Sequence, residues 1–279
     1  MFLWTLRHTP PGFARFYTKL LDLALPRLRR IAMRNLTLAY PEKNDRERKQ
    51  IVDGVFASIA RLLTAFARFP TLNAQNISDW IRYEGLEHYR EAKSRGKGVL
   101  IATAHVGNWE LSAFAHALMT EPMNIVVRPL DNPAIDALVE RYRQLSGNRI
   151  ISKRDAARGI VRALHNNEAV GILIDQNTSA AEGAFIDFFG TKACAGLAFA
   201  KIAARTGATV IPGFALWSEA EKKYVLRFYP PVEIGGDAVQ DTQRIHSVLE
   251  RVIREHPEQW LWIHRRWKTR PEGERGVYE

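Results

Sequence analysis

The 279-residue chain is predicted to be an α/β protein, with a mixed, largely parallel sheet covered by helices on both faces and an N-terminal helical extension. Short apolar runs such as GVLIATA and AVGILID alternate along the chain with segments whose apolar residues recur at helical spacing. A content of 46% hydrophobic and 25% charged residues is typical of a folded domain rather than of an extended disordered chain. No repeat, low-complexity tract or linker interrupts the pattern, so we expect one domain over residues 42–279, preceded by the extension of residues 1–41.

The first helix of the domain is expected over residues 44–68, because Asn44 or Asp45 can cap it. The run 98–104 is apolar and bounded by glycine and polar residues, which predicts a strand, and a helix follows from Glu110. The later elements alternate in the same way, and glycine or proline marks the ends of several helices. In order they are a strand at 124–129, a helix at 132–147, a strand at 149–152, a helix at 154–167, strands at 169–175 and 184–190, a helix at 194–207, strands at 208–217 and 224–234, and a helix at 241–256.

The positive charge of the chain is concentrated in its N-terminal extension. Residues 1–41 hold seven basic residues and one acid, and therefore carry +6 of the net charge of +10. Apolar residues recur there at helical spacing from Phe13 to Ile31, and Pro26 is expected to kink or divide the helix. Such a helix can lie on an anionic membrane surface, or it can dock its apolar face on the rest of the protein with the arginines in water. Nucleic acid is not an expected partner, because no recognised binding motif interleaves the charge with aromatic residues.

Cysteine usage and hydropathy exclude several classes of protein. The single cysteine, Cys194, rules out an internal disulfide and a cysteine-based metal cluster, and it fits a reducing compartment. No signal peptide is visible, and no run of about 18 apolar residues occurs, so we predict no transmembrane helix. No second histidine has ligand spacing to His105, so neither a metal nor another cofactor is expected.

The segment GVLIATAHVGNWELSAF, residues 98–114, holds the strongest candidate for catalysis. His105 ends the apolar run, and Glu110 lies in the first turn of the next helix. A histidine paired with a carboxylate can take a proton from a hydroxyl group near neutral pH. Gly107 permits an unusual backbone angle and Asn108 is a suitable N-cap, so the two side chains would meet across a strand–turn–helix. The alternative is a buried histidine that a local carboxylate satisfies.

A second match to the same spacing, His116 to Glu121, lies along one predicted helix and past its end. At roughly 100° per residue, five residues separate two side chains by about 140° around a helix, so they would not face each other. We therefore expect His116 to be a helix residue without a catalytic role.

Polar groups stand at the carboxyl ends of three of the predicted strands. They are His105, Arg128, and Asp175 with Gln176. If the strands are parallel, these groups share one rim of the sheet, where α/β enzymes place their sites. The forked cation of Arg128 suits a phosphate or a carboxylate, and Asp175 could orient a polar substrate or pair with Arg128. The alternative is an ion pair that only closes the sheet edge.

The motif TAHVGNWE resembles the first motif of the bacterial lipid A secondary acyltransferases, the branch of the glycerolipid acyltransferase superfamily in which glutamate closes the His-x-x-x-x-acid box. Mycobacterial phosphatidylinositol mannoside acyltransferases are close relatives of this branch. The segments VVRPLDNPAID, LIDQNTSAAEGAFIDFFGTKACA and PEQWLWIHRRWKTRPEG also stand in family-like order, so the resemblance covers most of the chain. Lys192 stands where a proline is frequent, and the chain lacks the hydrophobic span with which many members begin.

The resemblance implies an enzyme on the cytoplasmic face of the inner membrane, and the lack of that span favours a peripheral, surface-bound one. It would move a fatty acyl chain from a thioester of acyl carrier protein or coenzyme A to a hydroxyl of a lipid acceptor. His105 would be the general base, Glu110 would orient the imidazole, and the oxyanion would bind to N–H groups at the helix N-terminus or to Arg128. The residues expected to bind substrate are Arg128, Asp175, Gln176 and Asn108.

The remaining reactive or basic residues have simpler interpretations. Ser112 and Cys194 lie in apolar helical patterns and are expected to be inert. In the tail EQWLWIHRRWK the tryptophans are expected to pack, and the roles of Arg265, Arg266 and Lys268 stay open.

Two other functions compete with acyl transfer. A thioesterase would use the same histidine and carboxylate with water as the acceptor. A lipid-binding protein with a vestigial site would need only the amphipathic N-terminus, and the intact set of polar residues argues against it.

Overall fold

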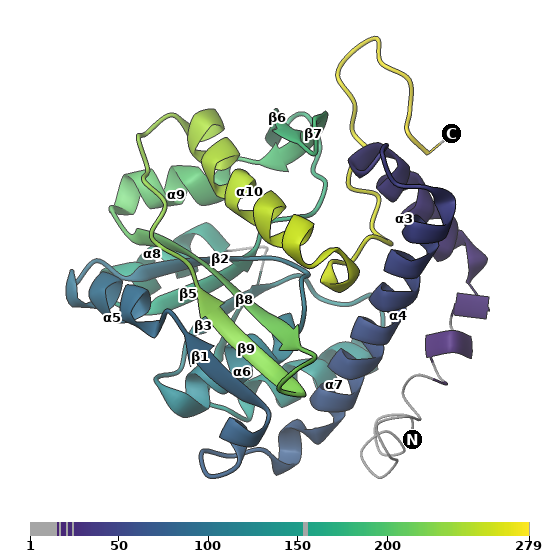
Figure 1. Cartoon of the computed structure of the whole chain (residues 1–279). Helices are drawn as coiled ribbons and strands as arrows, with labels where there is room; N and C mark the ends of the chain where they lie inside the picture. Colours follow the sequence, from purple (N-terminus) through teal and green to yellow (C-terminus); the bar gives the residue numbers. More distant parts are fainter. Residues whose placement is uncertain (1–15, 17, 21, 24, 153–155, 279) are drawn as a thin grey trace.

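The computed structural model describes residues 16, 18–20, 22–23, 25–152 and 156–278. A seven-stranded sheet in the order β1-β9-β8-β2-β5-β3-β4 forms its centre (Figure 1). The strands are β1 (Ile81–Glu84), β2 (Val99–Thr103), β3 (Asn124–Val127), β4 (Arg149–Ser152), β5 (Ala169–Leu173), β8 (Thr209–Ser218) and β9 (Lys223–Phe228). Neighbouring strands run parallel except for the hairpin of β8 and β9. The predicted mixed, largely parallel sheet is confirmed.

Helices cover both faces of this sheet, also as predicted. They are α3 (Pro26–Ala39), α4 (Asp45–Arg68), α5 (Leu86–Ser94), α6 (Trp109–Met119), α7 (Pro133–Gln144), α8 (Ala156–His165), α9 (Ala198–Thr206) and α10 (Ala238–Glu255), with 3-10 turns at Phe69–Thr71, Ile77–Asp79 and Pro257–Gln259. Side chains alternate along β2, so Ile101 packs with residues of α4, α5 and α6, whereas Leu100 packs with residues of α8, α9 and α10. The two apolar clusters therefore lie on opposite faces of the sheet.

The sequence pattern misses or misassigns three elements. It predicts neither β1 nor α5. It also predicts a helix from Cys194, whereas Cys194 lies in β7 (Thr191–Gly196), which pairs antiparallel with β6 (Gly183–Phe188). Phe189 and Gly190, both with positive φ, close this hairpin, and the small side chains of the CAG segment suit a buried strand as well as a helix.

The N-terminal extension is divided at Pro26, which occupies the first turn of α3. The apolar face of α3 is buried, with Ala32 and Leu36 inside the cluster that also contains residues of α4, so this part of the extension docks on the protein. Before it, residues 16, 18–20 and 22–23 are helical, and Leu20 and Leu23 are 46% and 73% exposed. Phe13, with which the predicted helix begins, lies outside the described residues.

One helical stretch in the described part of the chain, Asp45–Thr71, is long and apolar enough to cross a membrane. No transmembrane helix is predicted from the sequence, because it holds no run of about 18 apolar residues. Of the most apolar window of this stretch, 61% is buried within the protein, as in the core helix of a soluble domain. Length and composition alone are therefore weak evidence for a span here.

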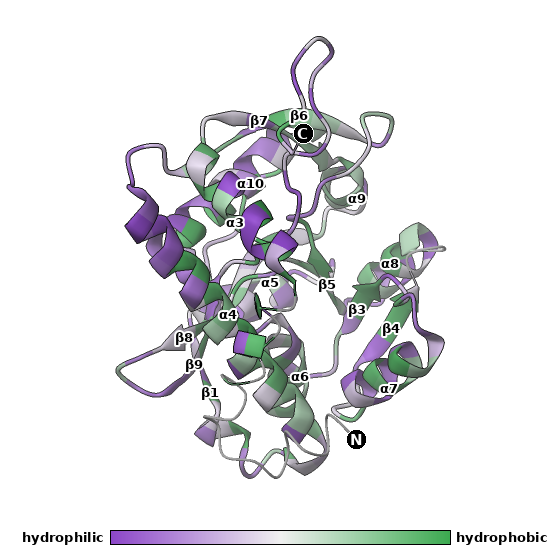
Figure 2. Ribbon diagram, turned by 90° about the vertical axis from the view of Figure 1, so that its right-hand side faces the viewer, coloured by the Kyte–Doolittle hydropathy of each residue, from purple (hydrophilic) through white to green (hydrophobic). Residues whose placement is uncertain are grey.

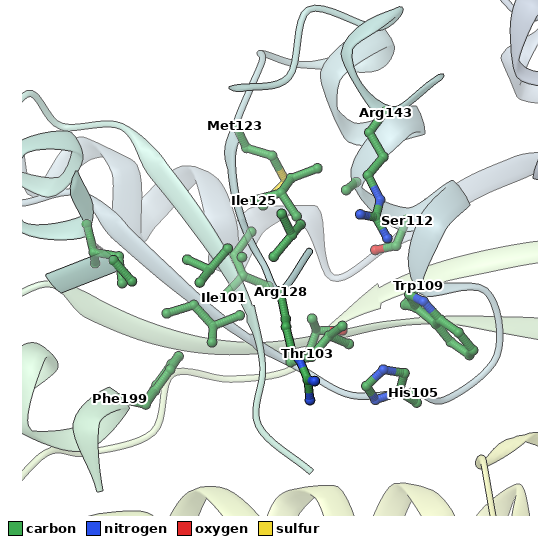
Figure 3. A pocket seen from close by; sticks show the side chains of 18 of the residues that line it. Ile101, Thr103, His105, Trp109, Ser112, Met123, Ile125, Arg128, Arg143 and Phe199 are labelled. Carbon is green, nitrogen blue, oxygen red and sulfur yellow. The ribbon is translucent and has the colours of Figure 1, made fainter. Parts of the chain in front are cut away.

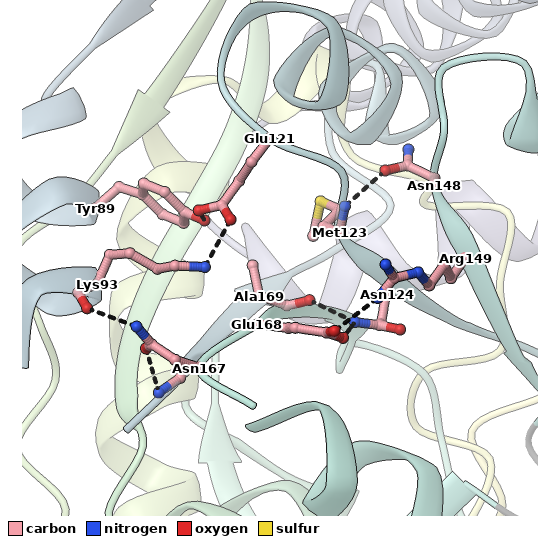
Figure 4. A network of polar contacts seen from close by, with 11 residues as sticks. Tyr89, Lys93, Glu121, Met123, Asn124, Asn148, Arg149, Asn167, Glu168 and Ala169 are labelled. Atoms are coloured by element: carbon pink, nitrogen blue, oxygen red, sulfur yellow. Dashed lines mark hydrogen bonds and ion pairs between the residues drawn. The ribbon is translucent and has the colours of Figure 1, made fainter. Parts of the chain in front are cut away.

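Strands β3 and β5 are joined near their amino ends and separate towards their carboxyl ends. The two strands pair at only two positions, the last being Ile125 with Gly171, whereas β5 and β2 pair at five. At the amino ends a polar network joins the strands: Glu168 accepts from Asn124 Nδ2 at 2.7 Å and from Arg149 Nη1 at 2.6 Å (Figure 4). Beyond Ile125 no further residue pair in the described strands joins β3 to β5, and Figure 2 shows β3 and β4 diverging from β5.

Candidate active site

The strand–turn–helix predicted around His105 is present. β2 ends at Thr103, and α6 begins at Trp109 with Asn108 as its N-cap, whose side-chain oxygen accepts from Leu111 N at 3.0 Å. Gly107 has a φ of 62°, and a Cβ there would lie 2.0 Å from the carbonyl oxygen of Ala215. Only glycine fits this turn, which carries His105 to the carboxyl rim of the sheet.

The carboxylate that binds the imidazole belongs to Asp175, at the end of β5. His105 Nδ1 lies 2.9 Å from Asp175 Oδ1, while Asp175 Oδ2 accepts from the backbone N–H of His105 at 3.0 Å and from Trp260 Nε1 at 2.8 Å. Burial opposes ionisation of Asp175, which is 3% exposed, but the charge of His105 and these donors outweigh it and hold the carboxyl pKa well below its usual range. Burial also opposes ionisation of His105 and so lowers its pKa. The attraction of the Asp175 carboxylate outweighs this effect, and the pKa of His105 is raised overall.

Glu110 does not make the contact that its spacing predicts. Its carboxylate binds the guanidinium of Arg143 in α7, with Nε to Oε2 at 2.9 Å and Nη2 to Oε1 at 2.6 Å. The first turn of α6 faces α7, whereas β5 lies beside β2 and delivers Asp175 directly to the imidazole. Asp175, and not Glu110, therefore contacts the imidazole, while the charge of Glu110 helps to raise the pKa of His105.

The other predicted residues divide into two groups. Arg128 and Gln176 share the rim with His105, as the parallel strands require, and both line a cavity there. Arg128 is exposed, with its guanidinium 3.8 Å from Asp131, so the suggested ion pair between Arg128 and Asp175 does not form. Asn108 is fully buried at the helix cap and does not line the cavity.

The cavity has a volume of about 1030 Å³ (Figure 3). Figure 3 shows His105 and Trp109 at one end of it and Phe199 at the other. Its polar lining comes chiefly from His105, Glu110, Ser112, Arg128, Arg143 and Gln176, and most of the rest is apolar. A polar cluster around His105 thus adjoins an apolar space, an arrangement that suits a ligand with a polar head and a hydrocarbon chain.

The second histidine–glutamate match is not a pair. Glu121 accepts from Tyr89 Oη and from Lys93 Nζ, both at 2.6 Å, as Figure 4 shows. His116 is buried in α6 with Nδ1 2.8 Å from Tyr83 Oη, and burial lowers its pKa to about 4. His116 is therefore a neutral helix residue, although its ring also borders the deep part of the cavity.

The tail makes contacts with the site that sequence reasoning missed. Trp260 packs in the core as expected, but its indole also donates to Asp175. On either side of Trp260, Gln259 O accepts from Gly107 N at 2.9 Å, and Leu261 N donates to His105 O at 3.0 Å. The tail thus fixes the backbone of the His105 turn, and no spacing in the sequence reveals this.

Two polar groups in and near the tail, the Arg266 guanidinium and the Cys194 thiol, are buried in the protein. Arg266 is fully buried and donates from Nη1 to the carbonyl oxygen of Cys194 at 2.6 Å, so it cannot reach a lipid phosphate at the surface. Burial raises the pKa of the Cys194 thiol, which argues against a nucleophilic thiolate. Within the described ranges, no group of three His, Cys, Asp or Glu side chains is arranged to hold a metal ion.

Comparison with known proteins agrees with this geometry. The family model for bacterial lipid A biosynthesis acyltransferases matches residues 1–269. The lipid A biosynthesis lauroyltransferase of Escherichia coli (strain K12) is 32% identical over 279 residues, covering 97% of this chain and 90% of the relative. The palmitoleoyltransferase of the same strain is 29% identical, covering 99% and 92%, and a lipid A biosynthesis acyltransferase of Haemophilus influenzae is 27% identical, covering 87% and 76%. The chain therefore belongs to the bacterial lipid A biosynthesis acyltransferase family.

Proposed function

We propose that this acyltransferase moves a fatty acyl chain from a thioester to a hydroxyl group of a lipid A precursor at the membrane surface, with His105 as the general base. The observation that carries the proposal is the hydrogen bond between His105 Nδ1 and Asp175, at the polar end of a cavity whose other lining residues are mostly apolar. Because Nδ1 binds the carboxylate, Nε2 is the nitrogen available to the substrate hydroxyl.

In the proposed reaction, Nε2 accepts the hydroxyl proton as the oxygen attacks the thioester carbonyl. The tetrahedral intermediate then expels the thiolate, which takes the proton from the imidazolium. Asp175 keeps the proton of the neutral ring on Nδ1 and stabilises the imidazolium. No acyl-enzyme is needed, because the thioester is already activated.

The oxyanion of the intermediate would be stabilised by positive groups in the cavity wall. Arg143 and the N-terminal turn of α6 both line the cavity beside His105. Glu110 binds two donor groups of Arg143, and this bidentate contact fixes the guanidinium plane while other N–H groups of the same side chain stay available. Glu110 would then be essential because it positions Arg143, and not because it contacts the imidazole of His105.

The donor and the cellular location belong to the same proposal. A net charge of +10 favours encounter with an acidic acyl carrier protein, and it favours an anionic membrane surface. The exposed Leu20 and Leu23 would contact lipid from the cytoplasmic side of the inner membrane.

The test is to follow thioester loss by the purified protein with and without underacylated lipid A, and to analyse the lipids by mass spectrometry. Acyl transfer that depends on the acceptor and is abolished in His105→Ala supports the proposal. His165→Ala is the matched control, because His165 is exposed on α8 and outside the cavity lining. Full-rate release of free fatty acid with no acylated lipid would instead identify a thioesterase.

A further inference from the structure

The cavity passes through the sheet where β3 separates from β5, and it therefore has two arms on opposite faces. Ile125 and Gly171 form the last residue pair between these strands. Cavity-lining residues come from both apolar clusters: Ile101 and Met123 belong to the α4–α6 side, and Ile160 and Phe199 to the α8–α10 side. The arms meet at the rim that carries His105.

One arm of the cavity, which we name the inner arm, lies on the α4–α6 side of the sheet. It is lined by Ile101, Met123, Ile125, Gly171, Leu226 and Phe228. Met123, Leu226 and Phe228 are 4%, 2% and 3% exposed, so this arm ends within the protein. The neutral ring of His116 also borders it and adds no charge. A closed apolar space of this kind fits one hydrocarbon chain of limited length.

The other arm of the cavity, which we name the outer arm, lies on the α8–α10 side of the sheet. It is lined by Val126, Ile160, Ile172, Phe199 and Ile202. Ile172 and Ile202 are half-buried, and Ala157 and Arg158 at its edge are exposed, so this arm opens to the surface. Arg158 at this edge and Arg128 on the rim both line the cavity and are exposed, so two cations border the outer arm. An apolar groove beside cations suits a lipid that carries an anionic headgroup and stays partly in the membrane.

We propose that the two arms hold two hydrocarbon chains at once: the transferred acyl chain in the inner arm and a chain of the lipid acceptor in the outer arm. The thioester carbonyl and the acceptor hydroxyl then meet at His105, where the arms join. The inference rests on the proposed function and adds the place of each substrate. It makes Gly171 and Met123 determinants of acyl length, because they form the inner wall where β3 and β5 part.

The inner arm is tested by filling and enlarging it. A Cβ at Gly171 would lie 2.7 Å from Met123 Cε and within 4 Å of nothing else, so Gly171→Val narrows the arm by displacing the end of a flexible side chain. We expect it to shift the preference in a series of octanoyl to hexadecanoyl thioesters towards shorter chains. Each methylene that is no longer buried should cost about fourfold in kcat/KM. Met123→Ala should shift the preference towards longer chains.

The outer arm supplies the matched control. Phe199→Ala should raise KM for underacylated lipid A on the order of tenfold, the value of about two buried methylenes, and leave the order of donor chain lengths unchanged. Conversely, Gly171→Val and Met123→Ala should leave the acceptor KM unchanged. Thermal unfolding of each variant shows whether it is folded. If Gly171→Val does not fold, Met123→Ala alone tests the inner arm.

Parental chain preference in both inner-arm variants would overturn the assignment, as would a reordering of donors by Phe199→Ala. Thioester consumption and binding of radiolabelled fatty acids report the inner arm even when water is the acceptor. Absence of lipid acylation by the parental protein would therefore contradict the proposed function, whereas an unchanged chain order contradicts the arms.

Discussion

Asp175→Asn changes one charge at the centre of the site and tests how His105 is held. An asparagine side chain has one acceptor oxygen and one donor NH₂ group. Oδ2 of Asp175 receives two N–H donors, from His105 N and Trp260 Nε1, so the amide oxygen will take that place. The NH₂ group then faces His105 Nδ1 and donates to it, which forces the ring proton onto Nε2 and removes the base.

The size of the effect follows from this inverted tautomer. The opposite amide orientation would leave two N–H donors facing an NH₂ group. Each unsatisfied donor would cost about 1–3 kcal/mol of free energy. We therefore expect kcat to fall on the order of 10⁴-fold, or about 5 kcal/mol, as when the same exchange inverts the tautomer in a Ser-His-Asp triad.

The pH profile gives a second readout of the same substitution. Asp175 raises the pKa of His105, so its loss should lower that pKa and move the acid limb of kcat/KM to lower pH, beneath a much lower plateau. Initial rates of thioester loss across the pH range, with circular dichroism to confirm folding, provide the measurement. A kcat within about tenfold of the parental value and an unmoved acid limb would refute this account of the site.

Three further outcomes are expected. Arg143→Lys keeps the charge but loses the bidentate contact with Glu110, so kcat should fall on the order of 10²-fold in the same assay, with donor KM unchanged; an unaffected kcat would exclude Arg143 from the oxyanion site. Leu23→Ser should weaken salt-sensitive sedimentation with anionic vesicles while the unfolding temperature is kept, and unchanged binding would point to another membrane contact. Burial lowers the pKa values of His116, His246 and His264 to about 4, so between about pH 6.5 and 4 the unfolded state binds protons that the folded state does not. Stability should therefore decrease as the pH is lowered through this window, and urea midpoints that are flat over it would contradict the prediction.

The sheet could be predicted because its evidence is local. Each of β2, β3, β4 and β5 is a short apolar run beside a helix with its own end signals, and this pattern gave the class of fold and the rim that carries Arg128 and Asp175. The hairpin of β6 and β7 is different, because small residues such as Cys194 fit either a strand or a helix. There, pairing between strands decided the structure.

The contacts of His105 could be predicted only in part, for a related reason. The turn was visible because Gly107 and Asn108 lie beside the histidine. The choice between Glu110 and Asp175 was not visible, because it depends on β5 lying next to β2, and their pairing is a property of the folded sheet. Sequence proximity favoured the nearer carboxylate, although residue 175 lies 70 positions from the imidazole that it binds.

The hydrogen bonds from the tail to the His105 turn have a consequence for synthesis of the protein on the ribosome. Every strand of the sheet precedes Gln259, so the sheet can form before the tail has left the exit tunnel. Until then Asp175 has no indole donor, and the carbonyl of His105 has no partner from Leu261. The His105 turn should therefore take its final form only after the tail has emerged from the ribosome.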